Sequence, residues 1–312
     1  MSFSTEIKQE IAANELKDCC KVAQLSALIQ LCSSLTISNR GLSLQIKSEN
    51  ATVAKRIYTL IKSLYNIDVG LSVVKKMNLK KNNIYILRIY DNTREILNDI
   101  GLYSSRGLLD KPLKKIVAKE CCARAYLAGA FMACGSCNSP NKTNYHLEIK
   151  ANSEAHALFM VELLERFYIK AKTIERRNHY VVYVKVADKI GDFLRCIGAS
   201  DSLLKFEDIR ISRDFTNSLT RLDNCEVANE MKTQKAASSQ IEDIKQLEKV
   251  INSLDVKLQE VCKIRLDNPE MSLNELCDVY ERLYGTPISK SGMKHRFTKI
   301  HELALKQKIE RS

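Results

Sequence analysis

The side chains of this 312-residue chain that are best suited to bind a ligand are basic and hydroxyl groups near its C-terminus. Residues 289–311 contain seven Lys or Arg residues against two Glu. Ammonium and hydroxyl groups bind phosphate oxygens, and a histidine or arginine among them can reach a base edge. The candidate nucleic-acid contacts are Ser289, Lys290, Ser291, Lys294, His295, Arg296 and Lys299.

The cysteines offer a second kind of chemistry. There are eleven, an odd number, and no secretory signal precedes them, which favours a reduced cytoplasmic protein over a disulfide framework. Cys134 and Cys137 form a CxxC, but a zinc site needs four ligands and the chain has no second CxxC or HxxxH. The adjacent pairs Cys19-Cys20 and Cys121-Cys122 cannot both face one direction on a helix. We interpret these cysteines as packing residues and predict no metal and no cofactor.

The formal net charge of the chain is +12. Such a balance favours a polyanionic partner, either nucleic acid or an anionic membrane surface. No apolar run approaches the ~20 residues that span a bilayer, so we expect no membrane segment. Nucleic acid fits this balance best, and the motif described next makes double-stranded DNA the expected partner.

Helices with buried faces must position the basic side chains. A capping box, Ser272 to Glu275, begins a helix that Gly285-Thr286-Pro287 interrupts, and a last helix starts at Ser289 or Lys290. Buried faces are expected in this region at Ile241, Ile244, Leu247 and Ile251, at Leu258, Val261, Cys262 and Leu266, at Leu276, Cys277 and Tyr280, and at Met293, Phe297, Ile300 and Ala304. Two helices joined by a turn, the second with a basic outer face, predict a helix-turn-helix at about 272–305.

A different element organises the rest of the chain. Residues 124–137 read as a helix almost without charge, with Ala128 and Gly129 in its middle, so a second helix is expected against it. Residues 19–33 match this segment at an offset of 102, and later strands and helices match as well. Residues 1–103 and 104–209 are therefore predicted to be two copies of one α+β unit, related by a pseudo-two-fold axis.

Two shorter segments flank this duplication. Residues 4–17 predict an amphipathic helix that Ser4 caps. Residues 210–238 are rich in Asn, Ser and Thr, and we interpret them as a polar linker with helical pieces. Residues 239–312 then form the helix-turn-helix domain.

The paired segments at 25–33 and 127–135 resemble the LAGLIDADG homing endonucleases. The resemblance implies two helices on the pseudo-dyad and saddle-shaped sheets that straddle DNA. In that family an acidic residue near the end of each helix binds the catalytic metal ions. That position falls on Cys32 and Cys134, and thiols are poor ligands for magnesium. The resemblance therefore implies the fold without the cleavage.

A wider resemblance, to the WhiA family of bacterial transcription regulators, covers nearly the whole chain. It rests on Cys19-Cys20, residues 124–135, Tyr145 to Ile149, Asn224-Cys225-Glu226, Ala228-Asn229, Lys232, Gln240, Asn268-Pro269-Glu270, Ser289 to Gly292, and His295-Arg296. Thr220 and Ala128 depart from the pattern, where Asn and Arg are usual. The resemblance implies a degenerate LAGLIDADG domain joined to a helix-turn-helix, with roles in cell division, chromosome segregation and, in spore formers, sporulation.

Further basic residues could contact the DNA backbone. Lys75-Lys76 and Lys80-Lys81 in the first copy and Arg176-Arg177 in the second fall on equivalent hairpins. They are either solvated loop residues or retained phosphate contacts. Arg221 and Lys232 of the linker are further candidates for such contacts.

The function expected from the sequence is a sequence-specific, DNA-binding transcriptional regulator without catalysis. It would bind promoter DNA, be cytoplasmic and associated with the nucleoid, and meet RNA polymerase or a sigma factor, the partners that the family resemblance implies. The alternatives are a metal-dependent endonuclease of the LAGLIDADG type, or a ligand- or redox-sensing module.

Overall fold

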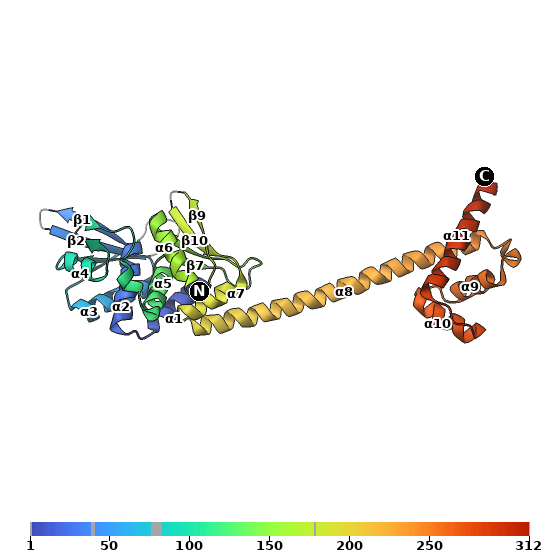
Figure 1. The fold of residues 1–312 in the computed structure, drawn as a ribbon, viewed down its shortest axis with the longest axis horizontal. Helices are drawn as coiled ribbons and strands as arrows, with labels where there is room; N and C mark the ends of the chain where they lie inside the picture. The colour runs from blue at the N-terminus through green and yellow to red at the C-terminus, as the bar shows by residue number, and fades with distance from the viewer. Residues whose placement is uncertain (1, 39–40, 76–82, 106, 178, 312) are drawn as a thin grey trace. The chain divides into compact units, whose positions relative to one another are not determined.

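The computed structural model describes residues 2–38, 41–75, 83–105, 107–177 and 179–311 (Figure 1). The chain divides into two compact units, residues 1–213 and 214–312. We describe each unit by itself.

The first unit contains the predicted duplication. The first copy consists of α2 (Asp18–Cys32), β1 (Ser33–Ser38), β2 (Gly41–Ser48), α3 (Ala51–Tyr65), β3 (Gly70–Lys75), β4 (Asn83–Ile89) and α4 (Thr93–Asp99). The second consists of α5 (Glu120–Cys134), β7 (Gly135–Cys137), β8 (Leu147–Ala151), α6 (Glu154–Glu165), β9 (Lys172–Arg176), β10 (His179–Val184) and α7 (Ala187–Cys196). The sheets share one strand order, β1-β2-β4-β3 and β7-β8-β10-β9, and all neighbours are antiparallel. The predicted α+β duplication is thereby confirmed.

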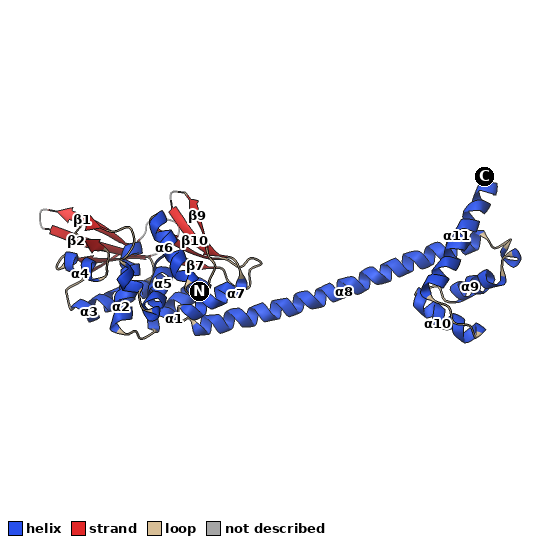
Figure 2. Ribbon diagram, viewed as in Figure 1, coloured by secondary structure: helices blue, strands red, loops and turns tan. Residues whose placement is uncertain are grey.

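Helices α2 and α5 form the centre of this unit. They run parallel, since Cys122 Sγ lies 3.5 Å from the Cys19 carbonyl oxygen at one end and Cys134 Sγ lies 3.9 Å from that of Leu31 at the other. Gly129 allows the close approach, because a Cβ there would stand 2.6 Å from the Gln24 carbonyl oxygen. Figure 2 shows the strands of both sheets above α1, α2 and α3 in this view.

The N-terminal helix and the connection between the copies complete the first unit. Helix α1 (Phe3–Ala13) is capped by Ser2, whose side chain accepts from Thr5 N, so the prediction of Ser4 as the cap is wrong. The Ser4 hydroxyl instead donates to the Cys137 carbonyl at 3.0 Å and accepts from Cys137 N at 2.9 Å, which ties α1 to β7. The two copies are joined by β5 (Tyr103–Ser104), β6 (Gly107–Leu108) and the 3₁₀ turn η1 (Lys114–Val117).

The predicted polar linker is a continuous helix. Helix α8 spans Ser200–Gln246, and the boundary between the two units falls inside it. The side chains of 214–232 are exposed, so this part of the helix buries no apolar face, although Phe215, Leu219 and Leu222 recur at helical spacing. Its hydroxyl groups bond within the helix: Ser218 donates to the Asp214 carbonyl at 2.8 Å and Thr220 to that of Thr216 at 3.0 Å. The interpretation as separate helical pieces is therefore wrong.

The second unit continues from α8 through the 3₁₀ turn η2 (Ile251–Ser253) to α9 (Val256–Asp267), α10 (Leu273–Tyr284) and α11 (Lys290–Arg311). Across the described ranges, no helix is both long enough and apolar enough to cross a membrane.

Candidate nucleic-acid interface

The helices of the second unit pack around one apolar core. Met293, Phe297, Ile300 and Ala304 of α11 are buried, as the spacing predicts. They meet Leu276 and Tyr280 of α10, Leu258, Val261, Cys262 and Ile264 of α9, and Ile244 and Leu247 near the end of α8. This core fixes one face of α11 and leaves the opposite face in solvent.

Local sequence sets the ends of α10 and the start of α11. The predicted capping box is present: Ser272 Oγ accepts from Glu275 N at 3.4 Å, and Glu275 Oε2 accepts from Ser272 N at 2.7 Å. Hydrogen bonds from Ser272, first of all the one from its backbone N–H, lower the pKa of the Glu275 carboxylate. Gly285 ends α10 with a φ of 66°, which favours glycine. Ser289 then caps α11, because its Oγ accepts from Gly292 N at 3.1 Å.

The first ten residues of α11 expose a face without acidic groups. Lys290, Ser291, Lys294, His295 and Lys299 are all exposed, and no Asp or Glu occurs before Glu302. Positions 290, 294 and 298 form one ridge of the helix, and 291, 295 and 299 form the next. The structure thus brings six of the seven predicted contact residues together: these five and the exposed cap Ser289.

Arg296, the seventh, has a different environment. Its guanidinium carbon lies 4.8 Å from the ring centroid of Tyr280 on α10, and Tyr280 is buried. Arg296 is half-buried, beside the core residue Phe297. This cation–π contact holds Arg296 within the unit and engages the guanidinium that a base contact would need.

The apolar spacing of the sequence did not predict the buried arginine that joins α8 to the core. It placed Leu266 on the buried face of α9, but Leu266 is exposed and Arg265 is buried. Arg265 donates from Nε to Gln240 Oε1 at 3.0 Å, and from Nη1 to the carbonyls of Met271 at 2.6 Å and Asn268 at 3.3 Å. The sequence pattern that could have identified Arg265 is its i, i+7 spacing from Leu258, which places it on the same helix face as Val261 and Cys262.

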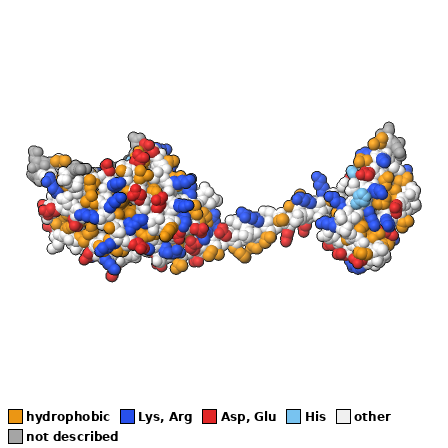
Figure 3. Space-filling model, viewed as in Figure 1, with side chains coloured by type: hydrophobic (Ala, Val, Ile, Leu, Met, Phe, Trp, Pro, Cys, Tyr) orange, Lys and Arg blue, Asp and Glu red, His pale blue; other side chains and the backbone are white. Residues whose placement is uncertain are grey.

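The other predicted backbone contacts are spread over the chain. Arg221 and Lys232 are exposed on α8. Lys75 ends β3 and Arg176 ends β9, at equivalent places in the two sheets, and Arg177 follows with a φ of 50°. Lys76, Lys80 and Lys81 lie outside the described residues. Figure 3 shows Lys and Arg side chains interspersed with acidic ones on the visible face of the first unit, so their roles as phosphate contacts stay predictions.

The positions that correspond to nuclease metal ligands contain two thiols and a nearby ammonium group. Cys32 and Cys134 are the last residues of α2 and α5, and Lys8 of α1 interacts electrostatically with both. Burial raises the pKa of the Cys32 thiol to about 12 and that of the Cys134 thiol in the same direction, although Lys8 opposes both shifts. Burial also lowers the pKa of Lys8. Neutral thiols beside a lysine do not offer the hard oxygen ligands that magnesium requires.

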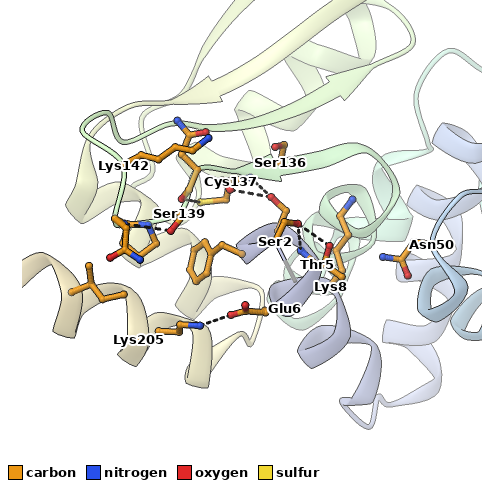
Figure 4. A pocket seen from close by; sticks show the side chains of 16 residues that line it. Ser2, Thr5, Glu6, Lys8, Asn50, Ser136, Cys137, Ser139, Lys142 and Lys205 are labelled. Atoms are coloured by element: carbon orange, nitrogen blue, oxygen red, sulfur yellow. Dashed lines mark hydrogen bonds and ion pairs between the residues drawn. The ribbon is translucent and has the colours of Figure 1, made fainter. Parts of the chain in front are cut away.

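A polar pocket of about 680 Å³ lies beside Lys8. Figure 4 shows Lys8 and Asn50 on one side of it and Ser139 and Lys142 on the other. Glu6 is the one carboxylate among its lining residues, and it forms an ion pair of 2.6 Å with Lys205. This pocket therefore adds amide, hydroxyl and ammonium groups to the region, and its single carboxylate is already paired.

The remaining thiols divide into two groups. Cys134 and Cys137, the predicted CxxC, donate toward different carbonyls, those of Leu31 and Asn138. The adjacent pairs behave otherwise: the sulfur atoms of Cys19, Cys20, Cys121 and Cys122 all lie within 4.8 Å of one another. The prediction that neighbouring cysteines on a helix cannot face one direction is wrong here, because the N-terminal ends of two parallel helices meet.

Comparisons with known proteins cover nearly the whole chain. Residues 18–103 match the WhiA N-terminal LAGLIDADG-like domain, 123–216 the WhiA LAGLIDADG-like domain and 219–304 the WhiA C-terminal HTH domain. A Bacillus cytotoxicus protein named "Probable cell division protein WhiA" is 46% identical over 310 residues, which are 98% of this chain and 97% of that protein. The protein of that name from Bacillus subtilis is 45% identical over 307 residues, 97% of this chain and 96% of its own length.

A solved structure shows the same fold. The crystal structure of full-length DUF199/WhiA from Thermatoga maritima superposes with a TM-score of 0.60 at 23% identity, covering 98% of this chain and 99% of that one. The three domain matches and the identity to the Bacillus proteins establish that the chain belongs to the WhiA family.

Proposed function

We propose that this chain is a sequence-specific, DNA-binding transcriptional regulator that acts in cell division and chromosome segregation and does no catalysis. Its relatives carry the name of probable cell division proteins, and the match to a helix-turn-helix domain includes all of α9 and α10. The observation that carries the proposal is the exposed, acid-free basic face on the first ten residues of α11.

The geometry suggests how this face would meet DNA. The first half of α11 would enter the major groove, as the second helix of such motifs does. Lys290 and Lys294 would neutralise phosphates, while Ser291 and His295 on the neighbouring ridge would meet base edges. Ser289 already accepts the Gly292 amide as a helix cap, and it shares a hydrogen bond of 2.9 Å with Ser291. Its hydroxyl is therefore already engaged in capping the helix, and we expect it to contribute less to DNA binding than the lysines do.

The test compares two pairs of lysines on one helix. Genomic fragments recovered by chromatin immunoprecipitation supply the target DNA, and fluorescence anisotropy gives Kd over a range of salt concentrations. Each lost phosphate contact lowers the slope of log K against log salt by about 0.9, so Lys290→Ala with Lys294→Ala should lower it by about 2. The matched control, Lys306→Ala with Lys308→Ala in the second half of α11, should leave the slope as it is. Equal slopes in both double variants would overturn the placement of DNA on this face.

The absence of catalysis is a separate part of the proposal. It rests on Cys32 and Cys134, whose protonated thiols occupy the positions that the nuclease family fills with carboxylates. Supercoiled plasmid incubated with the full chain and magnesium should stay intact. Nicking that a metal chelator prevents, and that the variant Lys8→Ala changes, would instead support an endonuclease.

The protein partner of the regulator stays a prediction. The family resemblance implies RNA polymerase or a sigma factor. Crosslinking in cells followed by mass spectrometry should recover polymerase subunits with the wild-type chain, and also with the Lys290→Ala and Lys294→Ala variant if the contact is direct. Loss of those subunits from the variant would mean that DNA alone joins the two proteins.

A further inference from the structure

Four cysteines from the two halves meet at the opposite end of α2 and α5 from Cys32 and Cys134. Cys19 and Cys20 are the second and third residues of α2, and Cys121 and Cys122 hold the same positions in α5. The sulfur atoms are 3.9 Å apart within the first pair and 4.0 Å apart within the second. All four lie within 4.8 Å of one another, which makes this the one such group of three or more candidate metal ligands among the described residues.

These distances fit a single tetrahedral metal ion. With a Zn–S bond of about 2.3 Å, neighbouring sulfurs of a Cys₄ site are about 3.8 Å apart. The two pairs already have this spacing, and a shift of about 1 Å or less brings the pairs together around one centre. A multi-iron cluster places metal and sulfide atoms between its cysteines and so needs a wider set.

Positively charged and partially positive groups lie at the starts of both helices. Both pairs lie in the first turn of a 15-residue helix, where the unpaired backbone N–H groups carry partial positive charge. Lysines precede both helices, at the cap positions Lys17 and Lys119. Positive groups at both helix ends therefore offset the excess negative charge of four thiolates around one divalent ion.

The nearby carboxylates do not compete for the ion. Asp18 is bound by Lys21 at 2.8 Å, and Glu120 by Arg124 at 2.5 Å. Access from solvent exists as well, because Cys20 and Cys121 line a surface pocket of about 500 Å³ and Cys121 is exposed. The pocket gives a metal ion a path to the buried Cys20 beside the exposed Cys121.

We propose that Cys19, Cys20, Cys121 and Cys122 bind one zinc ion, which links the two halves of the duplicated domain. Each half supplies two ligands, so neither half holds a complete site. Four protein ligands close the coordination sphere, which makes the ion structural and leaves no position for a substrate. The link joins the starts of the two central helices, and the packing at Gly129 holds their middles.

The test measures metal in the full chain. Protein expressed with added zinc and purified with its thiols reduced should contain one zinc per chain by inductively coupled plasma mass spectrometry. Reconstitution with cobalt should give the intense visible absorption and the sulfur-to-metal charge-transfer band of a tetrahedral thiolate site. Removal of zinc by a strong chelator should lower the unfolding temperature of the first unit, because the ion binds the folded form.

Single variants with matched exposure locate the ligands. Cys121→Ser removes an exposed thiol of the cluster, and Cys225→Ser removes an exposed thiol on α8. The first should lose most of the zinc and the cobalt charge-transfer band, and the second should keep both. A wild-type chain that stays free of zinc with all eleven thiols reduced would overturn the proposal.

Two other results would also overturn it. Equal zinc content in Cys121→Ser and Cys225→Ser would place the ion elsewhere. A disulfide within the cluster, seen as the loss of two hydrogens in the intact mass of protein from reducing cytoplasm, would favour a redox pair instead. None of these readouts involves DNA, so they are independent of the function proposed for α11.

Discussion

Gly129 faces Gln24 with no room for a side chain: a Cβ on the glycine would stand 2.6 Å from the Gln24 carbonyl oxygen and 3.1 Å from Ala27 Cβ. The nearest atom belongs to a helix backbone, which cannot rotate away. Gly129→Ala should therefore force α2 and α5 apart. Overpacking costs about 1–3 kcal/mol, against about 1 kcal/mol that alanine gains within a helix. We expect a net loss of about 1 kcal/mol in the unfolding free energy of the first unit.

Gly70→Ala is the matched control for this variant. The same added methyl at Gly70 would lie 3.7 Å and 3.8 Å from Arg88 atoms, which is ordinary van der Waals contact. Differential scanning calorimetry of both variants should show a lower transition for the first unit in Gly129→Ala alone. Equal unfolding temperatures in the two variants would mean that α2 and α5 can move apart at Gly129 at little cost in free energy.

Gln24, Gly129 and the helices around them show what sequence could predict. Small residues in a charge-free helix, repeated at an offset of 102, were enough to infer the paired helices and the duplication. The continuous helix α8 was not predicted, although Ile211, Phe215, Leu219 and Leu222 recur at helical spacing, because its Asn, Ser and Thr residues look like loop formers.

The sites were less predictable than the fold, and for geometric reasons. The four-thiol cluster depends on two helix ends meeting in space, which the spacing of cysteines along one helix does not reveal. The prediction for α9 chose Leu266 as the buried residue because leucine is apolar. Arg265 has the spacing of the buried face, although arginine is rarely buried. The exposed lysines of α11 were predictable, since they alternate with a strongly apolar face.

Arg265 itself gives a prediction about the second unit. It is 1% exposed, and burial lowers the pKa of its guanidinium, yet three acceptors on α8, after α9 and before α10 surround it. Arg265→Lys keeps the charge but cannot reach these acceptors with a planar fork. Breaking such a buried network costs about 3–5 kcal/mol, and we expect a loss of about 3 kcal/mol in the second unit.

Arg282→Lys provides the control, because Arg282 is exposed on α10 and its Nε donates only to the Asp278 carbonyl among the hydrogen bonds described for it. Chemical unfolding followed by far-ultraviolet circular dichroism should separate the two variants. If Arg265→Lys were as stable as Arg282→Lys, the arginine would not be what joins α8 to the core.

His156 predicts a pH dependence of the first unit. It is fully buried, and its Nε2 lies 2.7 Å from Tyr126 Oη, which also donates to Gln30 Oε1 at 3.4 Å. The short hydrogen bond to Tyr126 engages Nε2, while Nδ1 is buried with no hydrogen-bond partner among the described residues. Burial lowers the pKa of His156 to about 4.

The direction of the pH effect follows from this lowered pKa. Below pH 6.5 the unfolded chain protonates the imidazole, while the folded chain excludes that proton until about pH 4. Protonation therefore favours the unfolded state, and stability falls as pH falls from 6.5 to 4, by at most about 3 kcal/mol. In His156→Gln, whose amide can still form a hydrogen bond with Tyr126, this loss of unfolding free energy between pH 6.5 and 4 should vanish. Urea unfolding of both proteins at pH 7 and pH 5 measures it, and parallel losses would refute the assignment.

Arg296 and Lys294 should separate stability from DNA binding. The Arg296 guanidinium lies over the Tyr280 ring, and Tyr280 Oη donates to Glu260 Oε2 at 2.6 Å, so the arginine belongs to a packed cluster. Arg296→Ala should lower the unfolding free energy of the second unit by about 1 kcal/mol and leave the salt dependence of DNA binding unchanged. Lys294→Ala should do the reverse, lowering the salt slope by about 0.9 at unchanged stability. If Arg296→Ala instead relaxed the preference for one base pair at unchanged stability, the guanidinium would leave Tyr280 to contact the base when DNA binds.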